Sequence, residues 1–248
     1  MGEVDGDNDT AMSVSENFTK PGRLHATYNF DLLEWAGLTV SEIREAILKA
    51  AEIFNNTGRL SFAFSNHDVP RVATRQLKAL GVSVKDSDRM QILLLKLQIS
   101  IIGSSCIYQG EELGLEDVTD IPKEKMQDPW GIEFAPTFLG RDTCRTPMVW
   151  NKKLPNGGFS RANKTWLPIA NKHLNRAAID SASDPKSIYN ELSKFLKWRK
   201  KQPAMMRANC MLNITGDHKE ISFERQSDNQ TLRCNFDFDT LTASFQEI

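Results

Sequence analysis

The sequence lacks an apolar run long enough to cross a membrane, and it also lacks an excess of charge of one sign. No apolar stretch approaches the ~20 residues that a membrane helix needs, and the net charge of the 248-residue chain is −1. The first residues show no basic segment followed by an apolar one, which is the pattern of a signal peptide. We therefore expect neither nucleic acid nor a membrane as a partner, and we expect a cytoplasmic protein.

Cysteine is scarce as well. The chain has only four cysteines, and none of them has the CxxC spacing of a zinc site or of a disulfide-rich scaffold. We therefore expect no metal site and no cofactor. Hydrophobic residues make up 40% of the chain and charged residues 25%, which is typical of a globular fold with a sizeable core. The four cysteines are Cys106, Cys144, Cys210 and Cys234.

The stretch "FSNHDVPR" places two polar, titratable residues directly after an apolar run. The run 60–64 is short and aromatic, which indicates a buried strand that ends at Ser65. In parallel α/β folds the loop after a strand carries reacting groups, because the scaffold is rigid and the loop faces a crevice. We therefore predict that His67 and Asp68 line a functional site.

Strands and helices alternate along the first 200 residues. A strand is expected within 23–33, and Thr39 and Glu42 then have the spacing of a capping box at the start of a helix that Gly58 ends. After the strand at 60–64, the apolar pattern predicts a buried helix from about Asp88 to Gly103. The order predicts βα units on a parallel sheet.

The remaining elements are less regular. Residues 106–108 are expected to form a brief strand, and residues 116–175 form a long segment of little periodicity, which is usually functional. Asp184 followed by Pro185 is expected to open a last helix, which ends before Pro203. Beyond it, 219–226 and 231–238 have the character of strands. We therefore divide the chain into an α/β part, 1–203, and a small β domain, 204–248.

Several motifs occur in an order that resembles one family of enzymes. The segments "FSNHDVPR", "CIYQGEELGL", "DPWGIEF", "GRDTCRTPMVWN" and "QPAM" are similar to those of the α-glucosidase branch of glycoside hydrolase family 13, the α-amylase-like (β/α)8-barrel enzymes. The most specific of these signals is "RTPMVW" following "QGEE". The resemblance implies that 1–203 is the second half of a TIM-type barrel, strands five to eight, and that 204–248 begins the C-terminal β domain.

The resemblance also implies roles for particular residues. A retaining glycosidase needs a carboxylate nucleophile and a carboxylic acid about 5–5.5 Å apart. Glu3, after Gly2, matches the glutamate that protonates the leaving group, and burial is expected to help it hold its proton. Asp68 matches the carboxylate that grips the hydroxyls of the reacting sugar, and His67 donates to the same hydroxyls. Arg141 is expected to hold the terminal glucose, with Arg145 as the rival.

One catalytic group of the family has no counterpart in these 248 residues. The nucleophile aspartate of the family lies in a "GFRxD" segment before the acid/base glutamate, and no "FRxD" occurs in the chain. We therefore interpret the chain as an N-terminally truncated piece of an enzyme that removes terminal α-linked glucose from small α-glucosides or maltooligosaccharides. We expect the piece alone to be inactive. The sequence does not indicate the oligomeric state or the preferred linkage.

Other interpretations remain open at this stage. The alternative interpretations are a non-catalytic, α-amylase-like partner subunit, and an α-glucoside isomerase or transglycosylase. Glu111 and Glu112 are expected to be scaffold residues of the last barrel strand, because neighbours on an extended segment point to opposite faces. His25 is expected to be a core residue. Arg141 has a second interpretation as a surface residue paired with Asp142.

Overall fold

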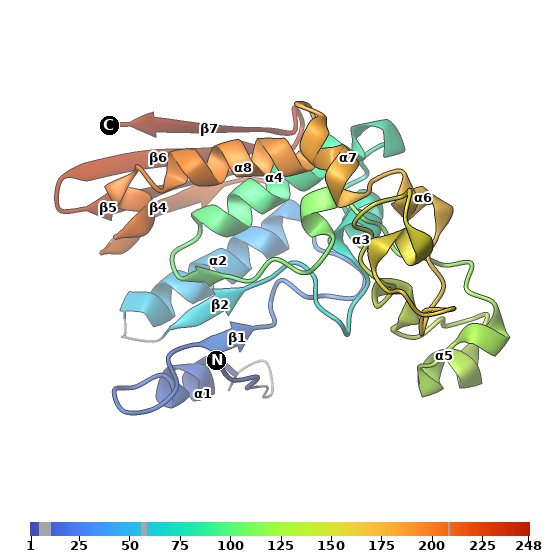
Figure 1. The fold of residues 1–248 in the computed structure, drawn as a ribbon. Helices are drawn as coiled ribbons and strands as arrows, with labels where there is room; N and C mark the ends of the chain where they lie inside the picture. Colours follow the sequence, from blue (N-terminus) through green and yellow to red (C-terminus); the bar gives the residue numbers. More distant parts are fainter. Residues whose placement is uncertain (5–10, 56–58, 208) are drawn as a thin grey trace.

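The computed structural model of the chain describes residues 1–4, 11–55, 59–207 and 209–248. Its first layer is a parallel sheet with the strand order β1-β2-β3 (Figure 1). Gly2 forms a parallel bridge with Thr27 on the free edge of β1, so four segments lie side by side in the order of the sequence. The predicted parallel sheet is confirmed, whereas the numbering of its strands within a barrel stays a prediction. The strands are β1 (Thr27–Asn29), β2 (Leu60–Phe62) and β3 (Ser104–Ser105).

Helix α2 (Val40–Asn55) connects β1 to β2 and begins at the predicted capping box. The N–H of Thr39 donates to Oε2 of Glu42 at 2.7 Å, and the N–H of Glu42 donates back to Oγ1 of Thr39 at 3.3 Å. These bonds satisfy N–H groups that a helix start leaves without partners. The predicted end at Gly58 lies outside the described residues. A short helix, α1 (Ala11–Phe18), precedes β1.

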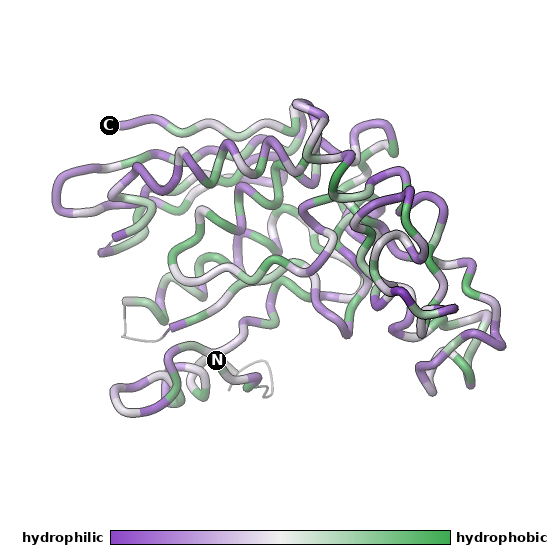
Figure 2. The backbone as a smooth tube through the Cα atoms, in the orientation of Figure 1, coloured by the Kyte–Doolittle hydropathy of each residue, from purple (hydrophilic) through white to green (hydrophobic). Residues whose placement is uncertain are grey.

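Helices α3 (Val72–Ala79) and α4 (Ser87–Ser100) lie between β2 and β3. The predicted buried helix is α4, which lies in the centre of the molecule (Figure 2), where hydrophobic positions gather. Its wide apolar face explains this position, because a helix that is apolar over much of its surface must be covered on several sides. The buried apolar residues of α4 are Met90, Leu93, Leu94, Leu95, Leu97 and Ile99.

The strand predicted at 106–108 is wrong, since β3 occupies Ser104–Ser105. The N–H of Cys106 still donates to the carbonyl of Phe62, at 2.8 Å. The buried side chain of Gln98 then intervenes: its Nε2 donates to the carbonyls of both Phe62 and Cys106, each at 3.0 Å. A glutamine from α4 thus replaces the strand partner at this point.

The segment 111–187, called the long connection below, folds into short helices around small cores of its own. One core joins Leu113 and Leu115 to Val149, and another joins Val118 to Leu167. The segment is therefore folded around its own cores, outside the parallel sheet. Its elements are η2 (Glu111–Leu113), η3 (Lys123–Lys125), α5 (Pro129–Phe134), η4 (Asp142–Cys144), η5 (Pro155–Gly158), α6 (Asn171–Leu174) and α7 (Ala178–Ser183).

Helix α8 (Ile188–Arg199) follows the long connection, and the prediction that Asp184 opens it is wrong. Oδ1 of Asp184 accepts the N–H of Lys186 at 2.9 Å in a turn that precedes the helix. Ser187 is the residue that caps α8, because its Oγ accepts the N–H of Asn190 at 3.2 Å. Both residue types favour helix starts, and the turn decides which of them is used.

The C-terminal part is an antiparallel sheet in the order β4-β5-β6-β7, and both predicted strands are present. The ring of Phe245 lies 5.1 Å from that of Phe195 and 4.9 Å from that of Trp198, so β7 packs directly on α8. One hydrophobic core continues from α4 into this sheet. The predicted division at 203 stays a prediction. The elements are α9 (Pro203–Met206), β4 (Cys210–Gly216), β5 (Glu220–Ser227), β6 (Gln230–Asp237) and β7 (Thr242–Glu247).

Candidate functional site

The loop after β2 turns outward because its own side chains satisfy its backbone. Oδ1 of Asn66 accepts the N–H groups of Asp68 and Val69, at 2.8 and 3.0 Å. This is the turn that asparagine forms with the backbone two residues on. The buried run and Ser65 lie inside, whereas His67 is exposed and Asp68 is half-buried. The prediction that a buried strand ends in a polar loop is therefore confirmed.

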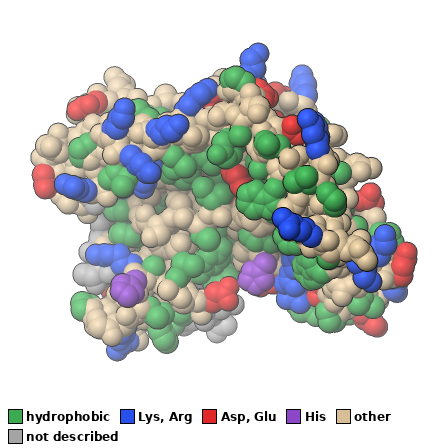
Figure 3. All heavy atoms as spheres, in the orientation of Figure 1, with side chains coloured by type: hydrophobic (Ala, Val, Ile, Leu, Met, Phe, Trp, Pro, Cys, Tyr) green, Lys and Arg blue, Asp and Glu red, His purple; other side chains and the backbone are tan. Residues whose placement is uncertain are grey.

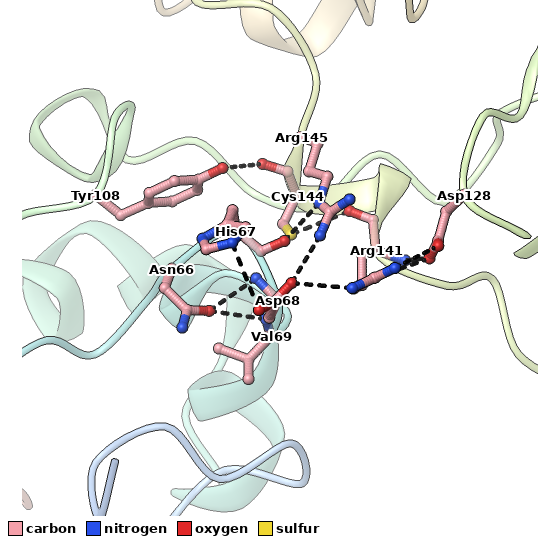
Figure 4. A network of polar contacts seen from close by, with 9 residues as sticks. All are labelled: Asn66, His67, Asp68, Val69, Tyr108, Asp128, Arg141, Cys144 and Arg145. Atoms are coloured by element: carbon pink, nitrogen blue, oxygen red, sulfur yellow. Dashed lines mark hydrogen bonds and ion pairs between the residues drawn. The ribbon is translucent and has the colours of Figure 1, made fainter. Parts of the chain in front are cut away.

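Asp68 is held by two arginines from the long connection (Figure 4). Its Oδ1 lies 2.7 Å from Nη2 of Arg145 and 3.2 Å from Nη1 of Arg141. Its Oδ2 lies 3.5 Å from Nε2 of His67. Arg145 also donates from Nε to the backbone carbonyl of His67 at 2.6 Å. The structure thus brings together His67, Asp68 and both arginines that the sequence left as rivals.

Arg141 is oriented from behind by a buried carboxylate. Asp128, whose side chain is 0% exposed, accepts from Nη2 of Arg141 at 2.9 Å and from its backbone N–H at 2.6 Å. The hydrogen bond from this guanidinium lowers the pKa of Asp128. The guanidinium also lies over the ring of Trp130, 4.8 Å from its centre. Asp142, the alternative partner expected for Arg141, instead accepts the N–H groups of residues 127 and 128.

Arg71, which the sequence analysis did not single out, connects the segments around the site. It is completely buried, and it donates to the carbonyl of Gln109 at 2.5 Å and to that of Cys144 at 2.9 Å. Its guanidinium lies 5.0 Å from the ring centre of Tyr108, whose hydroxyl donates to the carbonyl of Cys144. Its position at the end of "HDVPR", next to the predicted site, was the available signal.

The secondary structure at Glu111 also differs from the prediction. This residue belongs to the helical turn η2 and not to a strand, so the argument from an extended segment does not hold for Glu111 and Glu112. Its side chain is buried and accepts the N–H of Tyr108 at 2.8 Å. Burial raises the pKa of Glu111 to about 7, because an ionised carboxylate loses its hydration inside the protein.

Glu3 lies next to β1, where the N–H of Tyr28 donates to the carbonyl of Gly2 at 2.9 Å. The side chain of Glu3 is exposed, so the burial expected for it is not found in this chain. It borders a hollow of about 410 Å³ together with His67. Asp68 does not line this hollow. The other residues around it include Tyr28, Asn66, Cys106, Tyr108 and Gln109.

Three further observations concern the described residues as a group. His25 is exposed, so the prediction that it is a core residue is wrong: the chain between α1 and β1 runs over the surface. Among the residues with described positions, no cluster of three or more His, Cys, Asp or Glu side chains could bind a metal ion. No helix in the same part of the chain is long and apolar enough to span a membrane.

Comparison with known proteins adds a family and several relatives. The model of the α-amylase catalytic domain matches residues 6–208. A probable α-glucosidase of Rhizobium meliloti (strain 1021) is 38% identical over 245 residues, which cover 98% of this chain and 43% of that protein. A glucan 1,6-α-glucosidase of Streptococcus dysgalactiae subsp. equisimilis is 30% identical over 189 residues, covering 69% of this chain and 34% of that protein. The chain therefore spans less than half the length of these curated relatives.

Solved structures show the same fold. An α-glucosyl transfer enzyme superposes with a TM-score of 0.82 and 33% identity, over 96% of this chain and 42% of that one. A trehalulose synthase of Pseudomonas mesoacidophila MX-45 superposes with a TM-score of 0.76 and 21% identity, over 92% of this chain and 45% of that one. At that identity the second likeness concerns the fold alone.

Proposed function

Because the chain belongs to the family of the α-amylase catalytic domain, we propose that it forms part of a retaining, exo-acting α-glucosidase. Its substrates are small α-glucosides and maltooligosaccharides, from which it removes the terminal glucose. The observation that carries this proposal is the carboxylate of Asp68, held between two arginines at the end of a parallel strand. The names of the two relatives, both α-glucosidases, support the same bond type.

Asp68 and His67 grip the hydroxyls of the reacting glucose. Both side chains are accessible, with 42% and 57% of their surface exposed, and Oδ1 of Asp68 is already bound by the arginines. Oδ2 of Asp68 and the ring of His67 therefore face a ligand together. Hydrogen bonds to the sugar that tighten as the ring becomes oxocarbenium-like lower the barrier, because they are stronger in the transition state than in the bound substrate.

Glu3 is the proton donor to the leaving group. Its place after a bridge to β1 and its position on the same hollow as His67 support this role. Protonation of the glycosidic oxygen needs a carboxylic acid on the side of the bond opposite the nucleophile. The covalent nucleophile comes from outside these 248 residues, since the chain contains no segment that resembles the nucleophile motif.

A chimaera tests the proposed function directly. This chain would replace the matching 43% of the Rhizobium meliloti relative, so that the relative supplies the rest of the fold. We expect the folded chimaera to hydrolyse maltose and to release glucose first as the α-anomer, which proton NMR resolves from the β-anomer. A folded chimaera that releases the β-anomer, or that binds maltose without any turnover, would contradict the proposal; the second result would favour the non-catalytic partner.

Transfer of glucose to an acceptor other than water is a second candidate. It is favoured by the 33% identity and the TM-score of 0.82 to an α-glucosyl transfer enzyme. The same chimaera distinguishes the two reactions if the products are counted at increasing acceptor concentration. Two molecules of free glucose for each maltose consumed support hydrolysis, and one free glucose together with one glucosylated acceptor for each maltose consumed supports transfer.

A further inference from the structure

Arg71 is a buried cation with an incomplete set of hydrogen bonds. On the face of the molecule shown in Figure 3, lysine and arginine side chains protrude into solvent, whereas Arg71 is completely buried. Its Nη1 and Nη2 donate to backbone carbonyls, but its Nε is buried without a hydrogen-bond partner among the described residues. Burying a cation costs free energy, and an unsatisfied donor adds to that cost. The stability of the fold therefore gives little reason for an arginine here, and the reason must lie in what it contacts.

The two carbonyls that Arg71 binds lie on two other segments around the site. Arg71 itself follows Asp68 by three positions. Its Nη1 donates to the carbonyl of Gln109 at 2.5 Å, and its Nη2 donates to the carbonyl of Cys144 at 2.9 Å. Cys144 ends η4 and directly precedes Arg145. One guanidinium therefore connects the loop after β2 to the segment after β3 and to the end of η4.

The peptide group between Cys144 and Arg145 is held at both of its polar atoms. Besides Arg71, the hydroxyl of Tyr108 donates to the carbonyl of Cys144, at 3.2 Å. The N–H of Arg145 lies in the same plane as this carbonyl and donates to the carbonyl of Asp142 at 3.1 Å. Three hydrogen bonds thus fix the plane of this peptide group, and with it the direction in which the chain enters Arg145.

The side chain of Arg145 must meet two acceptors at once (Figure 4). Its Nε donates to the carbonyl of His67 at 2.6 Å, and its Nη2 donates to Oδ1 of Asp68 at 2.7 Å. The planar guanidinium presents its donors at fixed angles, so a rotation of the backbone that carries it would break at least one of the two bonds. The contact between Arg145 and Asp68 therefore depends on how the backbone at Cys144 is held.

We propose that Arg71 is a positioning residue for the reaction: it holds the carbonyl of Cys144 and thereby sets the guanidinium of Arg145 against Asp68. The assignment rests on the proposed function, because it takes Asp68 as the carboxylate that binds the reacting glucose. Arg71 is itself completely buried, so it acts on the substrate only through Arg145 and Asp68.

Hydrogen exchange at two arginine side chains tests the assignment in the 248-residue chain, without any reaction. The Nε–H of Arg145 is bound to the carbonyl of His67. The Nε–H of Arg141 is bound to Oδ2 of Asp128 at 3.2 Å, away from Arg71 and Cys144. Each group gives a proton–nitrogen NMR signal that Arg→Lys variants assign. We expect Arg71→Lys, which cannot bind two carbonyls as a fork, to speed exchange at Arg145 about tenfold and to leave Arg141 unchanged.

Arg75→Lys is the matched control. Arg75 is also buried, and its three hydrogen bonds likewise go to backbone carbonyls, but none of these lies in the long connection. The variant should lower Tm without changing exchange at Arg145. The carbonyls that Arg75 binds are those of Leu32, Glu34 and Pro70.

Tyr108→Phe is a milder second variant, which decides the question if Arg71→Lys does not fold. It keeps Arg71 and removes the hydroxyl that donates to the carbonyl of Cys144. Exchange at Arg145 should become about two- to fivefold faster, as for the loss of one neutral hydrogen bond, again without a change at Arg141.

In the chimaera, the assignment makes Arg71 and Arg145 one unit. Arg71→Lys should slow maltose hydrolysis about tenfold on its own, and it should add nothing once Arg145→Lys is present, because residues that act through one another are not additive. Losses that multiply in the double variant would mean that Arg71 affects the reaction by another route, and the assignment would be wrong.

Three outcomes of the exchange experiment would also overturn the assignment. Equal acceleration at Arg145 and Arg141 would mean that Arg71 only stabilises the fold. Unchanged exchange at Arg145 would mean that its contacts do not depend on Arg71. Acceleration of the same size in Arg75→Lys would mean that any buried arginine nearby has this effect. No bond of a substrate is broken in this experiment, so its result is independent of whether the chimaera is an α-glucosidase.

Discussion

The two carboxylate oxygens of Asp68 have different surroundings. Both arginines contact Oδ1, whereas Oδ2 faces His67 at 3.5 Å among the described residues. The two contacts at Oδ1 therefore fix the direction in which Oδ2 points. The two arginines that the sequence left as rivals therefore bind the same oxygen. Arg145, which also holds the backbone of His67, has the shorter contact.

Variants of Glu3 and of Asp68 should differ in how strongly their hydrolysis rates depend on the leaving group. In the chimaera, Glu3→Gln should slow maltose hydrolysis about 10²–10⁴-fold, because general acid catalysis is lost, but should slow cleavage of α-glucosyl fluoride far less. Azide should partly restore turnover. Asp68→Asn should instead slow both substrates, about 10²–10³-fold, because it weakens the transition state of the sugar itself. Equal losses on maltose and on the fluoride for Glu3→Gln would show that its assigned role is wrong.

Glu111 should make the fold less stable as the pH rises. Its pKa is 4.5 when exposed and about 7 when folded, so between these values the folded chain binds more protons than the unfolded chain. The free energy of unfolding therefore falls through this window, by an amount on the order of 1–3 kcal/mol from this residue. Glu111→Gln should remove that part of the slope, as measured by urea unfolding at pH 5 and at pH 7.5.

The comparison with the variant is needed because other groups titrate in the same range. Burial raises the pKa of Asp117 to about 6, which acts in the same direction, and lowers that of His173 to about 4, which acts in the opposite direction. Only the difference between wild type and Glu111→Gln isolates one residue. An equal difference at both pH values would contradict the assignment.

At the scale of elements, α5 and η4 form one brace behind the site. Asp128, directly before α5, binds Arg141, and Asp142 in η4 binds the backbone of 127 and 128 in return. The two ends of the "DPWGIEF…GRD" segment are thereby closed on each other. The orientation of Arg141 toward Asp68 is thus a property of the closed brace.

Asp128→Asn should have a larger effect on substrate binding than on the stability of the fold. In the chimaera we expect KM for maltose to rise about tenfold, as for the loss of a charged hydrogen bond, with a small change in kcat. Glu133→Gln, an exposed change on α5, is the matched control and should have no effect. Asp142→Asn weakens the brace without removing the partner of Arg141. If it lowers Tm and raises KM to the same extent as Asp128→Asn, Asp128 has a structural role only.

Elements with local signals could be predicted from the sequence, and contacts between distant segments could not. The capping box of α2 joins residues three apart, so its chemistry is visible in the sequence. The start of α8 was mispredicted because Asp184 and Ser187 are both good caps, and only the preceding turn decides between them. Arg71 reaches Cys144 across 73 positions, and no periodicity encodes such a contact. The roles of His67 and Asp68 came from the resemblance.

For the whole molecule, the parallel sheet remains open among the described residues. Its order runs from the Gly2 bridge through β1 and β2 to β3, and both residues of β3 are exposed. Open strand edges can pair with other chains. We therefore expect the isolated 248-residue chain to bind a hydrophobic dye and to self-associate. A monomeric chain that melts cooperatively and binds no dye would contradict this expectation.

The isolated chain should not hydrolyse p-nitrophenyl α-glucoside. Neither Glu3 nor Asp68 replaces the covalent nucleophile, for which the sequence has no candidate segment. Release of p-nitrophenol, followed by absorbance, should stay at the level of buffer alone. Reproducible turnover that is abolished by Asp68→Ala would show that these residues suffice.

The core shared by α4, α8 and the antiparallel sheet has a consequence for the order of folding. The carbonyl of Ser100 at the end of α4 accepts from Arg225 of β5, and the ring of Phe245 of β7 packs against Phe195 of α8. During synthesis, α4 leaves the ribosome long before these partners exist. Its cover is completed only after the last strand emerges, and contacts so far apart in sequence form slowly. A ribosome that pauses before β7 would therefore present α4 and α8 to chaperones with their apolar faces uncovered.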